Sequence, residues 1–325
     1  GVTHLSGVGC PDLGVPVIAP IVGGVPLSPG DYASAYRNEI AHAGYYAVEL
    51  GERGLVAEMS ATPRTAVFRF WFPQGESAQV EIDPARGVSW VRNQGDFPEP
   101  LGLDEIVGSA AHGLFCANGE GGRLYFVARA DRPADRVEQL TIDGDPGKAS
   151  AYWHYDHAPA EPLTVWVGLS WVSIAEARAN LDAERLPFDE ARDEAARAWQ
   201  ERLGRIELSG GSAEERTKFY TALYHALLHP SILSDVGGSY RRFPRGEIAQ
   251  AGDVPRYTVF SLWDTYRTLH PLLSLVYPEV QLEILCSLED MTLGAGAPPK
   301  WELLAEEVQM MVGDPAAIVF ADSYA

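Results

Sequence analysis

The residues with the clearest chemical potential stand together between Tyr257 and Arg267, where the sequence reads YTVFSLWDTYR. An indole, a carboxylate, a phenol and a guanidinium follow one another within this stretch, beginning at Trp263. Trp beside Asp can hold a sugar, because the ring covers the apolar C–H face and the carboxylate accepts hydroxyl protons in charge-assisted hydrogen bonds. The alternative is structural: the stretch begins a helix that Ser261 or Asp264 caps, with both aromatic rings in the core.

Longer stretches around these residues resemble a known family. FYTALYHALLHPSILSDVGGSYR, YTVFSLWDTYRTLHPLLSLVYPE and PKWEL…MVGDPAA are similar to the first part of the catalytic domain of glycoside hydrolase family 92. Nearer the start, HLSGVGC and GYYAVEL…GLVAEMSATPRTAVFRFWFP resemble that family's N-terminal domain. The resemblance runs in order along almost the whole chain.

The resemblance implies an exo-acting, calcium-dependent α-mannosidase that hydrolyses terminal mannose from glycans, N-glycans among them, with inversion. Trp263 and Asp264 match the family's Trp-Asp pair, which implies that Asp264 holds hydroxyls of the terminal mannose and that Trp263 shapes the pocket. The predicted substrate-binding set is Trp263, Asp264, Arg267, Lys300, Trp301, Glu307 and His4.

Inversion requires a general acid on the leaving oxygen and a general base on the opposite face of the sugar, roughly 6.5–9.5 Å apart. The family carries them in EGNAWQY-like and GNDD-like motifs, and neither motif occurs in this sequence. We therefore assign no catalytic residue and expect the acid, the base and the Ca²⁺ ligands outside these 325 residues. The adjacent Glu306 and Glu307 are not a substitute, because neighbouring side chains point apart on a helix or strand.

Three alternatives stay open at this point. Glu306-Glu307-Val308-Gln309 departs from the family's commoner Asn-Glu-Thr pattern, so a hydrolase that uncaps mannose-1-phospho-6-mannose is one of them. The others are a non-catalytic carbohydrate-binding fragment and a different α/α-toroid enzyme, such as a glucosidase or rhamnosidase.

Composition limits the class of partner. The net charge is −20, which argues against nucleic acid and anionic membranes, since both bind basic patches. A neutral, mannose-containing glycan is compatible with it. No apolar run is long enough to cross a bilayer. The three Cys residues show no metal-binding spacing, and neither a disulfide nor an oligomeric state is indicated.

The likeness to the family implies a secreted, periplasmic or cell-surface protein, and the excess of Arg over Lys hints at a bacterial gene. No signal pattern begins the chain, and both ends are expected to be cut.

The pattern of residues predicts a β domain followed by an α domain. Short alternating runs between turn residues, from Tyr45–Leu50 to Leu163–Trp171, indicate an antiparallel β-sandwich over residues 1–172 that lacks its first strands. An amphipathic helical connector with a solvated charged face is expected over 173–208. Residues 209–325 are expected to form the start of an (α/α)6 toroid, including one helix from Trp263 to Leu275 that is kinked at Pro271.

Overall fold

The computed structural model describes residues 2–3, 13–24, 34–87, 96, 98–112, 122–141, 149–308 and 310–324. It divides into two compact units, the first including Leu13–His112 and Arg123–Arg197 and the second including Ala198–Ala325. His4, Cys10 and Cys116 lie outside the described residues.

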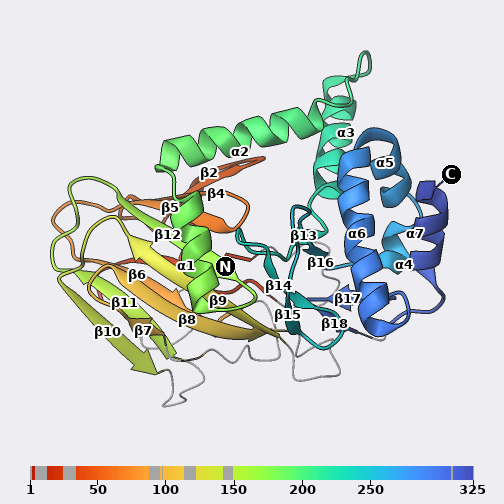
Figure 1. Cartoon of the computed structure of the whole chain (residues 1–325). Helices are drawn as coiled ribbons and strands as arrows, with labels where there is room; N and C mark the ends of the chain where they lie inside the picture. The colour runs from red at the N-terminus through yellow and green to blue at the C-terminus, as the bar shows by residue number, and fades with distance from the viewer. Residues whose placement is uncertain are drawn as a thin grey trace. The chain divides into compact units, whose positions relative to one another are not determined.

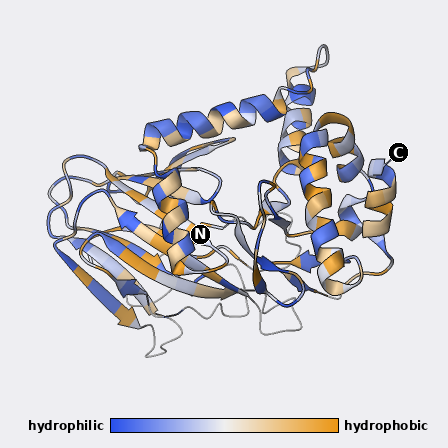
Figure 2. Ribbon diagram, in the orientation of Figure 1, coloured by the Kyte–Doolittle hydropathy of each residue, from blue (hydrophilic) through white to orange (hydrophobic). Residues whose placement is uncertain are grey.

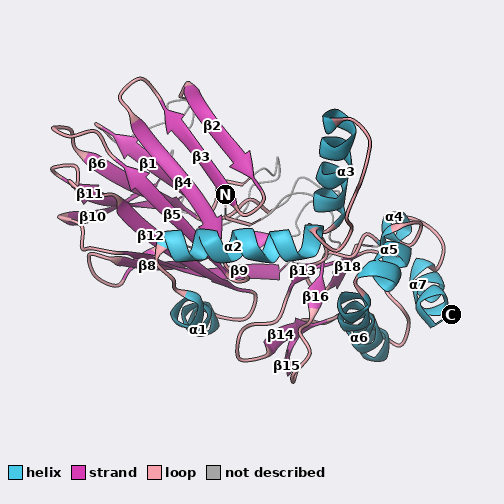
Figure 3. Ribbon diagram, turned by 90° about the horizontal axis from the view of Figure 1, so that it is seen from above, coloured by secondary structure: helices cyan, strands magenta, loops and turns pink. Residues whose placement is uncertain are grey.

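The first unit consists of two antiparallel sheets (Figures 1 and 3). The smaller has the order β1-β6-β11-β10, and the larger has the order β2-β3-β4-β5-β12-β9-β8-β7. The strands are β1 (Val17–Val22), β2 (Tyr36–His42), β3 (Tyr45–Leu50), β4 (Leu55–Ala61), β5 (Thr65–Trp71), β6 (Ala78–Asp83), β7 (Glu99–Pro100), β8 (Glu105–His112), β9 (Gly122–Ala130), β10 (Arg136–Thr141), β11 (Ala149–Tyr155) and β12 (Leu163–Ser170).

Apolar side chains from both sheets form one core, as the alternating pattern predicts. Phe70 of β5 lies opposite Ala57 of β4 and Leu163 of β12, and all three are fully buried. Trp153 and Ile82 fill the same core from the smaller sheet. The predicted antiparallel β-sandwich is therefore confirmed. Trp153 has no exposed surface, so its ring is a core residue and cannot stack on a sugar.

The smaller sheet is also buried on its polar face. Glu81 has no exposed surface, and it accepts a 2.9 Å hydrogen bond from the Tyr152 hydroxyl. Arg86 lies 3.6 Å from Glu81 and 3.2 Å from the buried Asp83. A buried carboxylate is costly unless it is paired, so this network keeps a polar strand face within the fold.

Two helices follow the sandwich: α1 (Ile174–Glu184) and α2 (Phe188–Leu203), the latter mostly hydrophilic in Figure 2. Gly168 of β12 lets α1 lie close against the sheet, because a Cβ there would be 2.5 Å from the Ala177 carbonyl oxygen and 2.7 Å from Leu181 Cβ.

The expectation that the charged residues of this connector form only a solvated face is wrong. Several make ion pairs with the sandwich: Arg178 with Glu105, Asp182 with Arg129, Glu184 with Arg64, and Asp189 with Arg69. Other charged residues of α2, such as Asp193, Glu194 and Arg197, are exposed to solvent as expected.

The second unit is helical, with short two-stranded ladders between the helices. Its helices are α3 (Ala213–Ala226), α4 (Leu262–Thr265), α5 (Leu269–Val276), α6 (Pro278–Ala295) and α7 (Pro315–Tyr324). Its strands are β13 (Ser231–Ile232), β14 (Ser239–Arg242), β15 (Glu247–Gln250), β16 (Tyr257–Thr258), β17 (Glu302–Leu303) and β18 (Glu306–Glu307).

A capping box begins α3, where Ser212 and Glu215 exchange their hydrogen bonds. Leu262, Ile284 and Leu288 are fully buried in the core of this unit. No helix in the described part of the chain is long and apolar enough to span a membrane.

The prediction of a single kinked helix from Trp263 to Leu275 is wrong. Two helices, α4 and α5, are separated by residues 266–268. Pro271 lies in the first turn of α5, where a missing N–H costs no hydrogen bond, so it does not act as a kink. Ser261 occupies the N-cap of α4, but its side chain makes no capping bond to the backbone.

Candidate functional site

Asp264 stands on the four-residue helix α4, with its carboxylate open to solvent. The residue is exposed, and Trp263 before it is half-buried. The Ser261 hydroxyl donates a short hydrogen bond to Asp264 Oδ2, and the Asp264 N–H donates to the Ser261 carbonyl at 3.0 Å. The bond from Ser261 orients the carboxylate, and no donor among the described residues bonds to Oδ1.

The guanidinium of Arg267 covers the aromatic rings beside Asp264. Its central carbon lies 4.6 Å from the Trp263 ring centroid and 4.9 Å from that of Tyr266, which is cation–π geometry. Arg267 Nε also donates to the Trp263 carbonyl at 3.3 Å. The stretch therefore presents an indole, a cation and a carboxylate within one turn. This combination can bind both the apolar face and the hydroxyls of a sugar.

A buried carboxylate, Glu302, holds the backbone that leads into α4. Its Oε1 accepts from the Thr258 hydroxyl at 2.7 Å and from the Ala305 N–H at 2.6 Å, and its Oε2 accepts from the Val259 N–H at 2.9 Å. The Glu302 carbonyl accepts from the Phe260 N–H at 2.9 Å. Complete burial raises the pKa of Glu302 to about 7, although these hydrogen bonds favour the ionised form.

Glu302 is unsuited to be a catalytic acid in spite of this pKa. Both of its oxygens are occupied by donors from the chain, and the residue has no exposed surface. A general acid must reach the substrate oxygen at hydrogen-bond distance. Its position therefore indicates an organising role.

The segments that donate hydrogen bonds to Glu302 include residues with a positive φ, which is unusual for L-amino acids. Val259 has φ +69°, and the turn between β17 and β18 has φ +55° at Leu304 and +69° at Ala305. A positive φ is rare for non-glycine residues and is an outlier for a β-branched one such as Val259. The Leu304 N–H donates to the Thr258 hydroxyl at 2.8 Å, so the same group of bonds supports the turn from both sides. Such strain persists only where its surroundings over-determine it, and it concentrates at functional sites.

A second carboxylate, Glu307, holds the segment that contains Lys300 and Trp301. Its two oxygens accept from their N–H groups, at 2.8 Å from Lys300 and 3.1 Å from Trp301. Lys300 and Glu307 also line a 420 Å³ pocket with Phe243, Pro244 and others. Glu306 is half-buried, and burial raises its pKa, so the two adjacent carboxylates occupy different environments.

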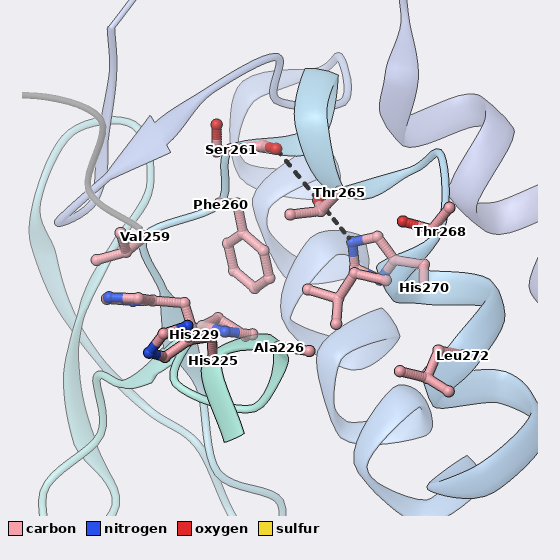
Figure 4. Close-up of a pocket in the computed structure, with 12 residues that line it drawn as sticks. His225, Ala226, His229, Val259, Phe260, Ser261, Thr265, Thr268, His270 and Leu272 are labelled. Atoms are coloured by element: carbon pink, nitrogen blue, oxygen red, sulfur yellow. Dashed lines mark hydrogen bonds between the residues drawn. The ribbon is translucent and has the colours of Figure 1, made fainter. Parts of the chain in front are cut away.

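The wider surroundings of α4 include a 510 Å³ pocket, shown in Figure 4. Ser261, Thr265 and His270 lie along one wall, and two further imidazoles, His225 and His229, are drawn nearby. His270 is almost completely buried, and burial lowers its pKa, so its imidazole is neutral at physiological pH.

His270 takes part in a chain of hydrogen bonds that begins at Thr265. His270 Nδ1 lies 3.1 Å from the Gln281 amide oxygen, an acceptor, so Nδ1 carries the proton and Nε2 faces the Thr265 hydroxyl at 3.1 Å. The Gln281 amide then donates to Ser323 at 2.9 Å. This chain connects α4 with α5, α6 and α7, and it leaves His270 without a free nitrogen for catalysis.

The predicted substrate-binding residues fall into separate groups. Trp263, Asp264 and Arg267 are brought together on and after α4, while Lys300 and Glu307 line the 420 Å³ pocket. Trp301 is only 5% exposed, with its indole turned into the interior. His4 is outside the described residues. Their roles in binding stay predictions.

Sequence reasoning missed Glu302 and Thr258. No local signal identified them, because a carboxylate between two apolar residues, as in Trp301-Glu302-Leu303, is also the pattern of a strand with one exposed face.

The described residues do not provide a set of ligands for the expected Ca²⁺. Within the described ranges, no group of three or more His, Cys, Asp or Glu side chains is placed to hold a metal ion. Calcium takes six to eight oxygen ligands, including several carboxylates. These residues alone do not fit the ion, and no chemistry of the site is derived through it.

Comparison with protein-family models gives a class for this fold and site. Residues 1–170 match the model of the glycosyl hydrolase family 92 N-terminal domain. Residues 176–325 match the model of the glycosyl hydrolase family 92 catalytic domain. The chain belongs to glycosyl hydrolase family 92, as the sequence resemblance predicted.

Solved structures agree with this assignment. An α-mannosidase of the family from Bacteroides thetaiotaomicron is 32% identical, with a TM-score of 0.89 over 98% of this chain and 46% of that one. The same enzyme has been solved in complex with mannoimidazole. An inverting mannosidase of the family from the same organism is 24% identical, with a TM-score of 0.84 over 94% of this chain and 42% of that one. This second match shows the shared fold alone.

A curated relative is more distant. The Arthroderma benhamiae protein named "Uncharacterized secreted glycosidase" is 24% identical over 58% of this chain and 28% of its own length. The chain thus spans less than half the length of the relatives it matches.

Proposed function

We propose that this chain is the sandwich and the first part of the catalytic domain of an exo-α-mannosidase that hydrolyses terminal mannose from glycans with inversion. Membership of family 92 and the likeness to an α-mannosidase that binds mannoimidazole support the proposal. The observation that carries it is the solvent-open carboxylate of Asp264 beside the half-buried Trp263, on a helix whose approach is rigidly held.

In this proposal the described residues bind sugar and leave proton transfer to other groups. Asp264 accepts two hydroxyl protons of the terminal mannose through its free lone pairs, and the edge of Trp263 limits the pocket. Arg267 donates to ring or hydroxyl oxygens while it stacks on Trp263. The general acid and base are supplied by residues outside these 325, as are the ligands of an assisting Ca²⁺.

Charge and similarity to a known relative indicate the type of substrate and the location of the proposed enzyme. A net charge of −20 favours a neutral glycan over nucleic acid. The relative named as secreted supports action outside the cytoplasm, and we propose a secreted, periplasmic or cell-surface bacterial enzyme.

The direct test is hydrolysis of α-mannosides by the full-length protein and by Asp264→Ala. Loss of a charged hydrogen bond to each of two hydroxyls should lower kcat/KM by roughly 100-fold or more, since each such bond contributes about 1.5–3 kcal/mol. The Tm should stay unchanged, because Asp264 is exposed.

Asp253→Ala is the matched control, because Asp253 is another exposed acid in the same unit. Wild-type turnover by Asp264→Ala would remove the main site assignment. The substrate panel should include 1,2-, 1,3- and 1,4-linked mannosides and mannose-1-phospho-6-mannose. Cleavage of the phosphodiester alone would replace the proposed activity with uncapping, and binding without cleavage would make the protein a carbohydrate-binding one.

A further inference from the structure

We propose that Glu302 is a positioning residue for sugar binding: it does not touch the sugar, and it sets where Asp264 stands by holding the backbone of Val259 and Phe260. This inference rests on the proposed function, because it concerns the same sugar site. It adds a determinant of affinity that lies in the interior, away from the ligand.

The first support is the completeness of the hydrogen bonding. Each oxygen of the Glu302 side chain has at least one donor, with three bonds between 2.6 and 2.9 Å. The donors come from the segment before α4 and from the β17–β18 turn. One carboxylate therefore ties together two loops that are far apart in sequence, and an antiparallel bridge between Phe260 and Glu302 continues the connection.

The second support is the path from Glu302 to the sugar-binding carboxylate. Val259, whose N–H bonds to Glu302, has φ +69°. Only Phe260 separates it from Ser261, whose hydroxyl bonds to Asp264. A relaxation of Val259 to an ordinary negative φ would redirect the chain at Ser261, and with it the carboxylate of Asp264. Because catalysis depends on sub-ångström placement, such a shift would weaken sugar binding.

The third support is the energetic cost of this carboxylate. A carboxylate with no exposed surface and no cationic partner among the described residues is expensive, and apolar side chains usually fill such positions more stably. Its presence is explained if the three donors must be held together in one geometry. A Gln side chain in its place has one acceptor oxygen and one NH2 donor group, so it cannot accept bonds at both terminal atoms.

Thr258 provides a matched pair of variants for the test. Its fully buried hydroxyl donates to Glu302 and accepts from the Leu304 N–H. Thr258→Val keeps the shape and removes both bonds, whereas Thr258→Ser keeps the hydroxyl. In the full-length protein, Thr258→Val should raise KM for an α-mannoside about tenfold and lower kcat/KM by roughly 10- to 100-fold. Thr258→Ser should stay within about threefold of the wild type.

Hydrogen exchange measures the hydrogen bonds of the Val259 and Ala305 amides to Glu302 directly, without any substrate. Glu302→Gln places an amide group against N–H donors, so exchange at Val259 or Ala305 should accelerate at least tenfold. Amides in the middle of α6 should keep their wild-type rates, which would separate local release from global unfolding.

The outcomes separate the two proposals. An unchanged KM in Thr258→Val, in a wild type that cleaves mannosides, would refute the positioning role alone. Unchanged exchange at both amides in Glu302→Gln would also refute it. A wild type that neither binds nor cleaves any mannoside would refute the proposed function, and the positioning role with it. Equal damage by Val and Ser at position 258 would show that packing, and not the hydroxyl, matters.

Discussion

Replacing Glu302 with Gln should change how the stability of this protein depends on pH. Burial raises the pKa of Glu302 from 4.5 to about 7 in the folded state, so the folded chain holds this proton more tightly than the unfolded chain. The contribution of Glu302 to stability is therefore most favourable below pH 4.5. It is lost as the pH rises from 4.5 through 7. A Gln at this position does not titrate.

The size of the effect follows from the two pKa values. A tenfold difference in proton affinity corresponds to about 1.4 kcal/mol, so a rise from 4.5 to about 7 corresponds to about 3 kcal/mol. The free energy of unfolding of the wild type should fall by about this amount relative to Glu302→Gln between about pH 4.5 and pH 8. Other titrating groups affect both proteins equally and cancel in the difference.

Urea denaturation of both proteins at several pH values, followed by tryptophan fluorescence, measures this difference. A ¹³C NMR titration of the glutamate carboxyl carbons locates the pKa independently. A difference that does not change with pH would mean that the hydrogen bonds to Glu302 outweigh its burial and that the carboxylate is ionised throughout. A difference of the opposite sign would refute the assigned effect of burial.

Two further predictions concern the metal and the sandwich. Chelation of calcium in the full-length protein should abolish mannosidase activity, and added Ca²⁺ should restore it; an unchanged rate after chelation would count against the calcium requirement. Gly168→Ala should destabilise the sandwich by about 1–3 kcal/mol, because the new methyl group would overlap the Ala177 carbonyl oxygen of α1. Ala128→Gly, in the neighbouring strand β9, is a control for the backbone effect of glycine. An unchanged denaturation midpoint for Gly168→Ala would mean that α1 is not held this closely.

Local sequence pattern was sufficient for much of the fold. Tyr45–Leu50 forms β3 with the predicted bounds. In α6, the apolar residues Ile284, Leu288 and Met291 recur at helical spacing and are buried, so the period alone indicates the helix. The pattern is weaker in β2, β8, β10 and β11, where polar or small residues interrupt the alternation. Burial of the polar residues of β11 depends on partners in other strands, which no local window contains.

The candidate site was predictable only where its residues adjoin in sequence. The grouping of Trp263, Asp264 and Arg267 followed from a single helical turn. The role of Glu302 did not, because it depends on left-handed conformations at Val259 and Ala305 and on hydrogen bonds between distant segments. Nothing in the propensities of Val or Ala indicates a positive φ.

The hydrogen bonds from Thr265 through His270 to Ser323 have a practical consequence for spectroscopy. The Nδ1 proton of His270 is sealed from water and bonded to Gln281, so it should exchange slowly and give a resolved downfield ¹H resonance. Since Thr265 belongs to α4, a movement of that helix would alter the environment of the imidazole. A mannoside titration could then be followed through one native proton, with no label attached to the sugar or to the helix that carries Asp264.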